Sequence, residues 1–397
     1  RVAYMEAMDR LHKQFPDDDE VTTFYALSLL SAARATDDNT FRPEMKAGAL
    51  AMQVFQRDPN HPGATHYIIH AFDDPVHAPL ALEAAFAYAK IVPAVSHAVH
   101  MPTHIFIQHG MWNEVAHQNV RAFNIAKDLW QPGDAPGDMA HSGDWGQYGF
   151  LQLGDYAGAR DRIRAFEEMA ETTKNARATS GLTLVRARYI VETEEWRVQP
   201  VADNASGSTV FANGMSAVAT GDLATAEKML TRLATIAKVP AAAAGAHADH
   251  GAAPAQPAAA GLSEGEKASR IMHHELAARI ADSKGQRDQA ITLLRQAVEI
   301  EESMRPPNGA ADPIKPSHEL LGETLGRAGK HADAAAAFDA CLLRMPNRAR
   351  SLYGAAKAYA AAGRADASRE RWAKLQSFWK GATLTPPDFG GSRYQER

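Results

Sequence analysis

The chain has 397 residues, of which 45% are hydrophobic and 22% are charged, with 42 Lys and Arg against 47 Asp and Glu. This length and apolar content are enough to bury a large core. Because the basic residues are scattered and the formal net charge is −5, the sequence shows no basic stripe, and we expect no nucleic-acid partner. No apolar run approaches the roughly 20 residues of a membrane span, so we expect none.

The residue types also limit the fold class and the possible metal ligands. Alanine is abundant and β-branched runs are few, which indicates an all-α protein. A single cysteine, Cys341, excludes an internal disulfide and a cysteine-rich zinc site, so a metal site here would use imidazole and carboxylate from the 17 histidines and the acidic residues. The first residues read as an amphipathic helix rather than a signal peptide, and we expect them to continue a longer precursor.

In chain order, the apolar pattern predicts a series of helix–turn–helix units. The first, 19–59, carries an insertion near Asp37–Pro43, and 180–199 fits only as a first helix. The other units are predicted over 62–93, 96–128, 140–170, 207–238, 271–304, 315–346 and 349–380. About eight units of this kind predict one continuous solenoid.

The clearest unit, 315–346, carries small and large residues at regular positions. Gly322 and Ala334 stand at positions 8 and 20, where small side chains let two helices approach, and Phe338 at position 24 fills the space beside them. Gly329 at position 15 and Pro346 at position 32 end the two helices. The chain resembles the tetratricopeptide repeat (TPR) superfamily at these positions. The resemblance implies an all-α, right-handed superhelical solenoid with a concave groove.

We expect one solenoid over 1–397, with two interruptions. The N-terminal repeats span 1–170, the middle repeats 171–239 and the C-terminal repeats 263–382, followed by a tail over 383–397. The Ala/Gly/Pro-rich stretch 240–262 has no apolar stripe to bury and reads as a mobile loop. The proline-rich stretch 305–316 is expected to run extended, either as a linker or as the border of a cleft.

Two His-x-x-x-His pairs are the strongest functional pattern. His66 and His70 lie four residues apart, as do His100 and His104, so each pair shares one helical face. Both pairs occupy positions 5 and 9 of consecutive units, which line the concave groove in TPR proteins. The same resemblance places three further groove residues beside them, His97, His141 and Asp144. We predict that these residues hold a transition metal, with His66, His70, His100 and His104 as the main ligands.

Pro102 falls between His100 and His104, where a helix interior would lose a backbone hydrogen bond. We therefore expect the first helix of this unit to be kinked or to start near Pro102. The adjacent Asp73 and Asp74 have two interpretations: they orient ligand imidazoles, or they form a helix end and turn.

Imidazole and carboxylate ligands suit Zn, Cu, Fe or Ni, and the sequence does not choose among them. Zinc with an open position would favour hydrolysis, with Asp144, Glu319 or Glu323 as general base, and iron or copper would favour oxygen activation. One alternative is a metal-free adaptor whose groove binds a peptide, protein or small molecule. Another is an enzyme without metal that depends on Asp144 or Glu319.

A longer block surrounds these histidines. It consists of the run from His66 to His70, the run His97-Ala-Val-His-Met-Pro-Thr-His-Ile-Phe106, and then Gly110 and Trp112. It is similar to a group of bacterial TPR proteins that carry the block HYxIH…HAxHMPxHIF. This resemblance implies no activity, and it implies export to the periplasm.

Overall fold

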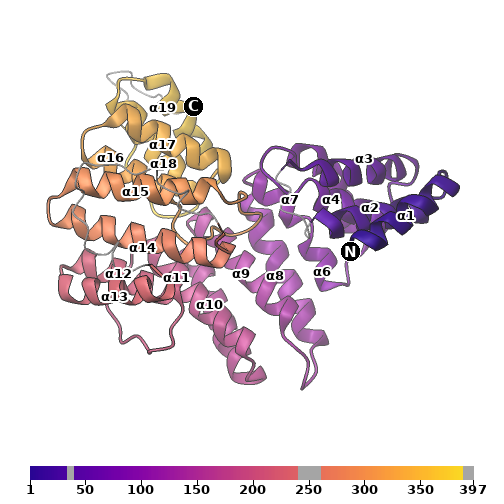
Figure 1. Cartoon of the computed structure of the whole chain (residues 1–397), viewed down its shortest axis with the longest axis horizontal. Coiled ribbons are helices and arrows are strands. Elements are labelled where there is room, and N and C mark those ends of the chain that lie inside the picture. The colour runs from indigo at the N-terminus through magenta and orange to yellow at the C-terminus, as the bar shows by residue number, and fades with distance from the viewer. Residues whose placement is uncertain (34–39, 240–260, 388–397) are drawn as a thin grey trace. The chain divides into compact units, whose positions relative to one another are not determined.

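The computed structural model describes residues 1–33, 40–239 and 261–387, and within them it contains helices and no strand (Figure 1). The described helices form two compact units, Arg1–Gly149 (unit 1) and Phe150–Arg397 (unit 2). None of the described helices combines the length and apolarity needed to cross a bilayer. The all-α prediction is confirmed. The loop predicted over 240–262 lies outside the described residues apart from its last two positions, as does the tail beyond residue 387.

Unit 1 consists of short, consecutive antiparallel elements. They are α1 (Val2–Gln14), α2 (Asp19–Ala33), α3 (Arg42–Arg57), α4 (Pro62–Ala71), the 3₁₀ turn η1 (Ala78–Ala81), α5 (Leu82–Ile91), α6 (Ser96–His100), α7 (Thr103–Gln108), α8 (Trp112–Leu129) and α9 (Gly137–Leu153), the last of which continues into unit 2. Helix α2 packs on both α3 and α4, and α8 packs on both α6 and α7. This is the neighbour-to-neighbour packing of a repeat protein.

Unit 2 continues the same pattern with longer helices. They are α10 (Tyr156–Thr173), α11 (Ala176–Thr193), α12 (Gly207–Thr220), α13 (Leu223–Ile236), α14 (Glu264–Ser283), α15 (Arg287–Glu302), α16 (Ser317–Arg327), α17 (His331–Arg344), α18 (Ala349–Ala361) and α19 (Ala365–Gln376). Each first helix packs on its own second helix and on the first helix of the next pair, as α12, α14, α16 and α18 do in turn. The chain is therefore a TPR-like α-solenoid.

Phe338 shows why the small positions of the repeat matter. An added Cβ at Gly354 would lie 2.3 Å from the Phe338 ring, and one at Gly322 would lie 3.0 Å from it. The ring thus occupies the space that both glycines leave between α16, α17 and α18, as the repeat positions predict. At the ends of first helices, Gly329 and Gly363 adopt φ of 73° and 75°, a backbone that residues with a Cβ rarely adopt.

Two predicted boundaries are refined by the structure. Helix α14 begins at Glu264, before the predicted start at residue 271, because Ser263 and Glu266 form a reciprocal capping box there. The weak unit at 180–199 is a single helix, α11, and residues 194–206 form no second helix. Residues 305–316 contain no helix, as their prolines predict.

Candidate metal centre

Six histidines from four helices of unit 1 lie in two groups of three, and within each group the ligand atoms are within 4.8 Å of one another. The outer group is His66 and His70 on α4 with His97 on α6. The inner group is His100 at the end of α6, His104 on α7 and His141 on α9. The structure therefore brings together all six histidines that the sequence singles out. Each predicted pair stays together, His66 and His70 in the outer group and His100 and His104 in the inner group.

The helix break at Pro102 puts His100 and His104 of the inner group on different helices. Helix α6 ends at His100 and α7 begins at Thr103, so the predicted interruption is confirmed. The Thr103 hydroxyl donates to the His100 carbonyl at 2.6 Å, which satisfies a backbone acceptor at the broken helix end. The break lets the His100 and His104 rings meet edge to face, with centroids 4.9 Å apart.

The outer group is partly open to solvent. The Nε2 atoms of His66 and His97 are 3.3 Å apart, and the His66 and His70 ring centroids are 4.7 Å apart. The His66 ring stacks nearly parallel on Tyr88, at 5.4 Å between centroids. His97 is exposed, whereas His66 and His70 are half-buried. An ion held by these three imidazoles would therefore remain reachable from water.

The inner group is more buried than the outer one, and only His141 is half-buried. His100 and His104 are only 1% and 7% exposed. The Trp145 indole, on the same helix as His141, packs against both rings, with centroids 4.9 Å and 4.4 Å away. The His141 ring completes the group at 4.4 Å from His100.

Hydrogen bonds determine which nitrogen of His100 carries its proton. The Asn119 amide donates through Nδ2 to the Thr103 hydroxyl at 3.1 Å and to the Val115 carbonyl at 2.8 Å. Its Oδ1 must therefore be the acceptor, and it lies 2.7 Å from Nδ1 of His100. His100 thus carries its proton on Nδ1, and its Nε2 is a bare acceptor.

His104 is oriented in the same way by a carboxylate. Its Nδ1 lies 2.6 Å from Oδ2 of Asp73, and because a carboxylate only accepts, Nδ1 of His104 carries a proton. The two Nε2 atoms of His100 and His104 then face each other at 3.0 Å. In the metal-binding form, with both rings neutral, these two Nε2 lone pairs would point at each other. A shared cation or proton is what stabilises such a pair.

Burial keeps the His100 and His66 imidazoles in the uncharged form that binds metals. Burial, followed by the positive charges that His104 and His141 would carry, holds the pKa of His100 well below its usual range. Burial and the neighbouring His97 lower the pKa of His66 from 6.5 to about 4. Both rings are therefore neutral at pH 7.

The observed spacings suit shared ligation. Two nitrogens bound to one ion at about 2.0–2.1 Å lie about 3.0 Å apart at a right angle and about 3.4 Å apart at the tetrahedral angle. The Nε2 separations of 3.0 Å in the inner group and 3.3 Å in the outer group fall in this range. The groups are also neighbours, since the His70 and His104 rings lie 5.9 Å apart.

The two interpretations of the adjacent aspartates each hold for one residue. Asp73 orients His104, whereas Asp74 forms the turn after α4 by accepting from the backbone N–H groups of Val76 and His77. Asp144 lies on α9, three residues after His141, and is half-buried.

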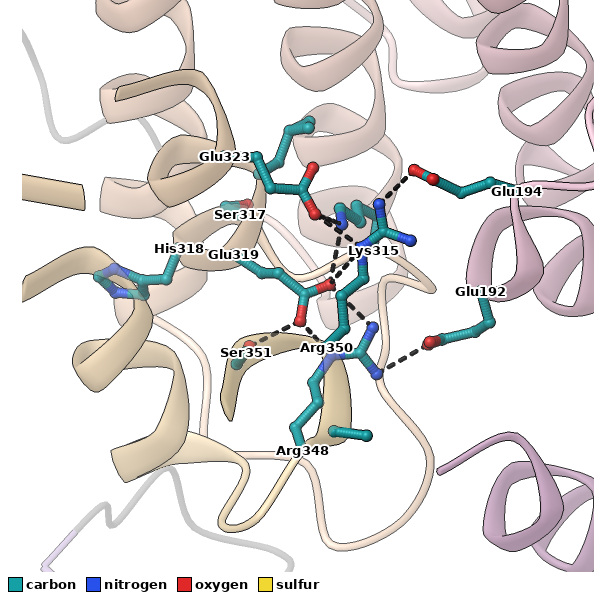
Figure 2. A network of polar contacts seen from close by, with 12 residues as sticks. Glu192, Glu194, Lys315, Ser317, His318, Glu319, Glu323, Arg348, Arg350 and Ser351 are labelled. Atoms are coloured by element: carbon teal, nitrogen blue, oxygen red, sulfur yellow. Dashed lines mark hydrogen bonds and ion pairs between the residues drawn. The ribbon is translucent and has the colours of Figure 1, made fainter. Parts of the chain in front are cut away.

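The other two carboxylates proposed as general bases lie in unit 2 and are engaged by cations (Figure 2). Glu319 accepts from Arg348 at 2.8 Å and from Lys315 at 2.8 Å, and Lys315 also reaches Glu323 at 2.7 Å. Burial alone would raise both carboxyl pKa values, but the nearby cations outweigh it and lower the pKa of Glu323 to about 2. The pKa of Glu319 is lowered in the same way. Such carboxylates are weak bases.

The sequence reading missed three residues that build the site, namely Asn119, Trp145 and Tyr88. Only Asn119 carries a recognisable signal. It occupies position 24 of its unit, where the clearest repeat has Phe338, so an amide replaces a large apolar side chain there. The aromatic residues read as ordinary core.

No protein-family model and no curated protein matches this chain. Several solved structures resemble it. The human IFIT1 dimer with m7Gppp-AAAA matches with a TM-score of 0.42 and 12% identity, over 94% of this chain and 77% of that one. Yeast Tom70 matches with a TM-score of 0.36 and 9% identity, over 95% and 88%. The Cut9–Hcn1 hetero-tetramer of the APC/C matches with a TM-score of 0.37 and 10% identity, over 94% and 55%. Because these scores are low, the fold assignment rests on the chain's own helix pairs and repeat positions.

Proposed function

We propose that this chain is a TPR-like solenoid that binds transition-metal ions, zinc, copper or iron, on the two histidine groups of unit 1. The observation that carries the proposal is the opposed pair of Nε2 atoms in the inner group, 3.0 Å apart, with each ring oriented by a hydrogen bond at its other nitrogen. A carboxylate or amide behind each ligand imidazole is the usual arrangement around protein-bound metals.

The two groups are suited to different roles. The buried inner group, packed against Trp145, is suited to an ion that stays in place. The outer group offers three imidazoles and an exposed edge, which leaves a coordination position for water or a substrate. Zinc bound by the outer group would lower the pKa of a water molecule in its open coordination position and support hydrolysis, whereas iron or copper would support oxygen chemistry. Asp144 as the general base stays a prediction.

Elemental analysis of protein purified without added metal tests the proposal. The parent is compared with His100→Ala/His104→Ala for the inner group and with His66→Ala/His97→Ala for the outer group. The control is His12→Ala/His117→Ala, which removes two unit 1 histidines that belong to neither group. We expect near-stoichiometric metal in the parent and the control. Each group variant should lose the metal that is bound by the group it lacks.

Folding failure is separated from ligand loss by circular dichroism and by the variants His100→Gln/His104→Gln and His66→Gln/His97→Gln, which keep size and polarity. Metal absent from the parent even after reconstitution with each ion would overturn the proposal, as would metal that both folded group variants retain. The former result would favour the adaptor alternative, in which the groove binds a peptide or protein partner.

A further inference from the structure

In unit 2, residues at the start of α18 contact residues of α11 and of the end of α9. Arg348, just before α18, forms an ion pair with Glu192 of α11 at 2.7 Å, and Arg350 pairs with Glu194 beyond the end of α11 (Figure 2). The Ala349 N–H donates to the Gln152 side chain at 3.0 Å. These contacts join segments more than 150 residues apart in the sequence. These contacts tie the start of α18 to α11 and to the end of α9 within unit 2.

A second set of contacts lies beyond the last helix. The Lys380 N–H donates to the Leu153 carbonyl at 2.7 Å. The Trp379 indole lies against Gly154, where an added Cβ would come within 2.7 Å of the ring. The segment after α19 therefore lies across the turn between α9 and α10.

Beside these contacts, unit 2 has a pocket of about 670 Å³ that is partly open to solvent, which we call the chamber. A volume of this size suits a small molecule of drug-like dimensions. Its walls carry five large aromatic side chains, namely Tyr156, Trp196, Phe338, Tyr353 and Trp379. The lining also includes the small residues Gly322, Gly326 and Ala358. The chamber thus combines flat apolar surfaces with room to hold a compact ligand.

The charges in the chamber are not balanced. Its lining includes the cations Arg279, Lys315, Arg327, Arg350 and Lys357, against the carboxylates Glu192, Glu194 and Glu323. The Lys357 ammonium lies over the Tyr353 ring, 5.3 Å from its centroid. A polar ligand here would meet a surplus of positive charge.

The surplus is concentrated where α14 meets α16. Arg279 and Arg327 both approach the Asp282 carboxylate, at 3.7 Å and 3.0 Å, and Arg287 shares that carboxylate at 3.0 Å from outside the chamber. Three guanidinium groups thus share one acceptor. Burial and then the charge of Arg327 lower the pKa of Arg279, as expected for two cations held close together.

We propose that the chamber binds a small organic anion, with its carboxylate or phosphate group at Arg279 and Arg327 and its apolar or aromatic body against the aromatic walls. Guanidinium groups bind both kinds of anionic head through paired hydrogen bonds. The ion pairs of Arg348 and Arg350 beside the chamber favour a compact ligand over an extended peptide. This inference does not depend on metal binding in unit 1.

Isothermal titration calorimetry of the full chain tests binding in the chamber with four probes: phenylacetate, phenyl phosphate, inorganic phosphate and the uncharged phenylacetamide. We expect saturable binding of at least one of the two aromatic anions, and the tighter one identifies the preferred head group. Phenylacetamide and inorganic phosphate are expected to bind at least about tenfold more weakly, because each lacks one half of the recognised chemistry.

The variant Arg279→Gln/Arg327→Gln should weaken the bound aromatic anion by about tenfold or more. Arg287→Gln is the matched control, since it removes a guanidinium from the same carboxylate outside the chamber, and it should change affinity by less than about twofold. Thermal unfolding confirms that each variant is folded, and Arg327→Lys serves if the double variant is not. No binding of either aromatic anion at about 10 mM would overturn the proposal, as would equal binding of phenylacetamide or affinity unchanged in the folded variants.

Discussion

Unit 1 and unit 2 use buried polar side chains in opposite ways. In unit 1, imidazoles from four helices face one another, and the hydrogen bonds behind His100 and His104 direct their two Nε2 atoms at the same point. In unit 2, the buried Arg348 and Glu319 face each other as opposite charges, at 2.8 Å. Like groups gathered at one point need a further partner, whereas opposite charges complete each other. We therefore propose the first arrangement as a ligand site, whereas the second ties parts of unit 2 together.

The largest expected effect on stability comes from removing Arg348, which ties parts of unit 2 together. In Arg348→Met, Glu192 and Glu319 lose a buried guanidinium that is only 1% exposed, which leaves carboxylates uncompensated inside the protein. We expect a loss of about 3–5 kcal/mol in the free energy of unfolding, measured by urea denaturation.

Arg369→Met is the control for this loss. It breaks the pair with Asp366, a surface residue, and should cost less than about 0.5 kcal/mol. A change below about 1 kcal/mol in Arg348→Met would mean that the buried pair contributes little and that the contrast with unit 1 is not energetic.

The next effect sharpens the contrast through pH, in protein stripped of metal. Because the folded-state pKa of His66 is lowered from 6.5 to about 4, its contribution to stability is present above pH 6.5 and is lost as the pH falls towards 4. The unfolded chain takes up the proton that the folded chain resists. We expect this residue to lower the free energy of unfolding by up to about 3 kcal/mol over that range, as measured by urea denaturation at several pH values.

His66→Gln should flatten this pH dependence, whereas His117→Gln, at an exposed position on α8, should leave it unchanged. An identical slope in the parent and in His66→Gln would show that His66 is not held neutral by its surroundings.

The smallest effect concerns the orientation of His104. Asp73→Asn replaces the carboxylate that accepts from Nδ1 with a neutral amide, while the imidazole itself remains. We expect metal affinity to fall by about 10–100-fold, measured by competition with a chromogenic chelator.

Asp74→Asn removes the same charge one residue further on, where the carboxylate forms a turn with His77 instead. Affinity should stay close to that of the parent in this control. Equal losses in both variants would point to general electrostatics and not to the Asp73–His104 hydrogen bond.

The sequence by itself determined the helical repeats and the set of histidines. Repeat positions are local: Gly322 and Phe338 lie within one unit, and the four-residue spacing of His66 and His70 follows from helix geometry alone. Pro102 likewise predicts the helix break at its own position, because proline has no backbone N–H to donate. The start of α14 was predicted too late although its capping box, Ser263 and Glu266, is also a local pattern.

Only the tertiary structure decided how these residues combine. The division into inner and outer groups depends on which helix faces which, and His97 joins His66 across two helices that the spacing does not relate. The Asn119 bond that sets the tautomer of His100 spans 19 residues, and the ion pair between Arg350 and Glu194 spans 156. Glu319 could be read from sequence as a candidate base, but its pKa depends on Arg348 and Lys315, which packing brings to it. Contacts of this range arise from the summed packing of many helices, and no local pattern records them.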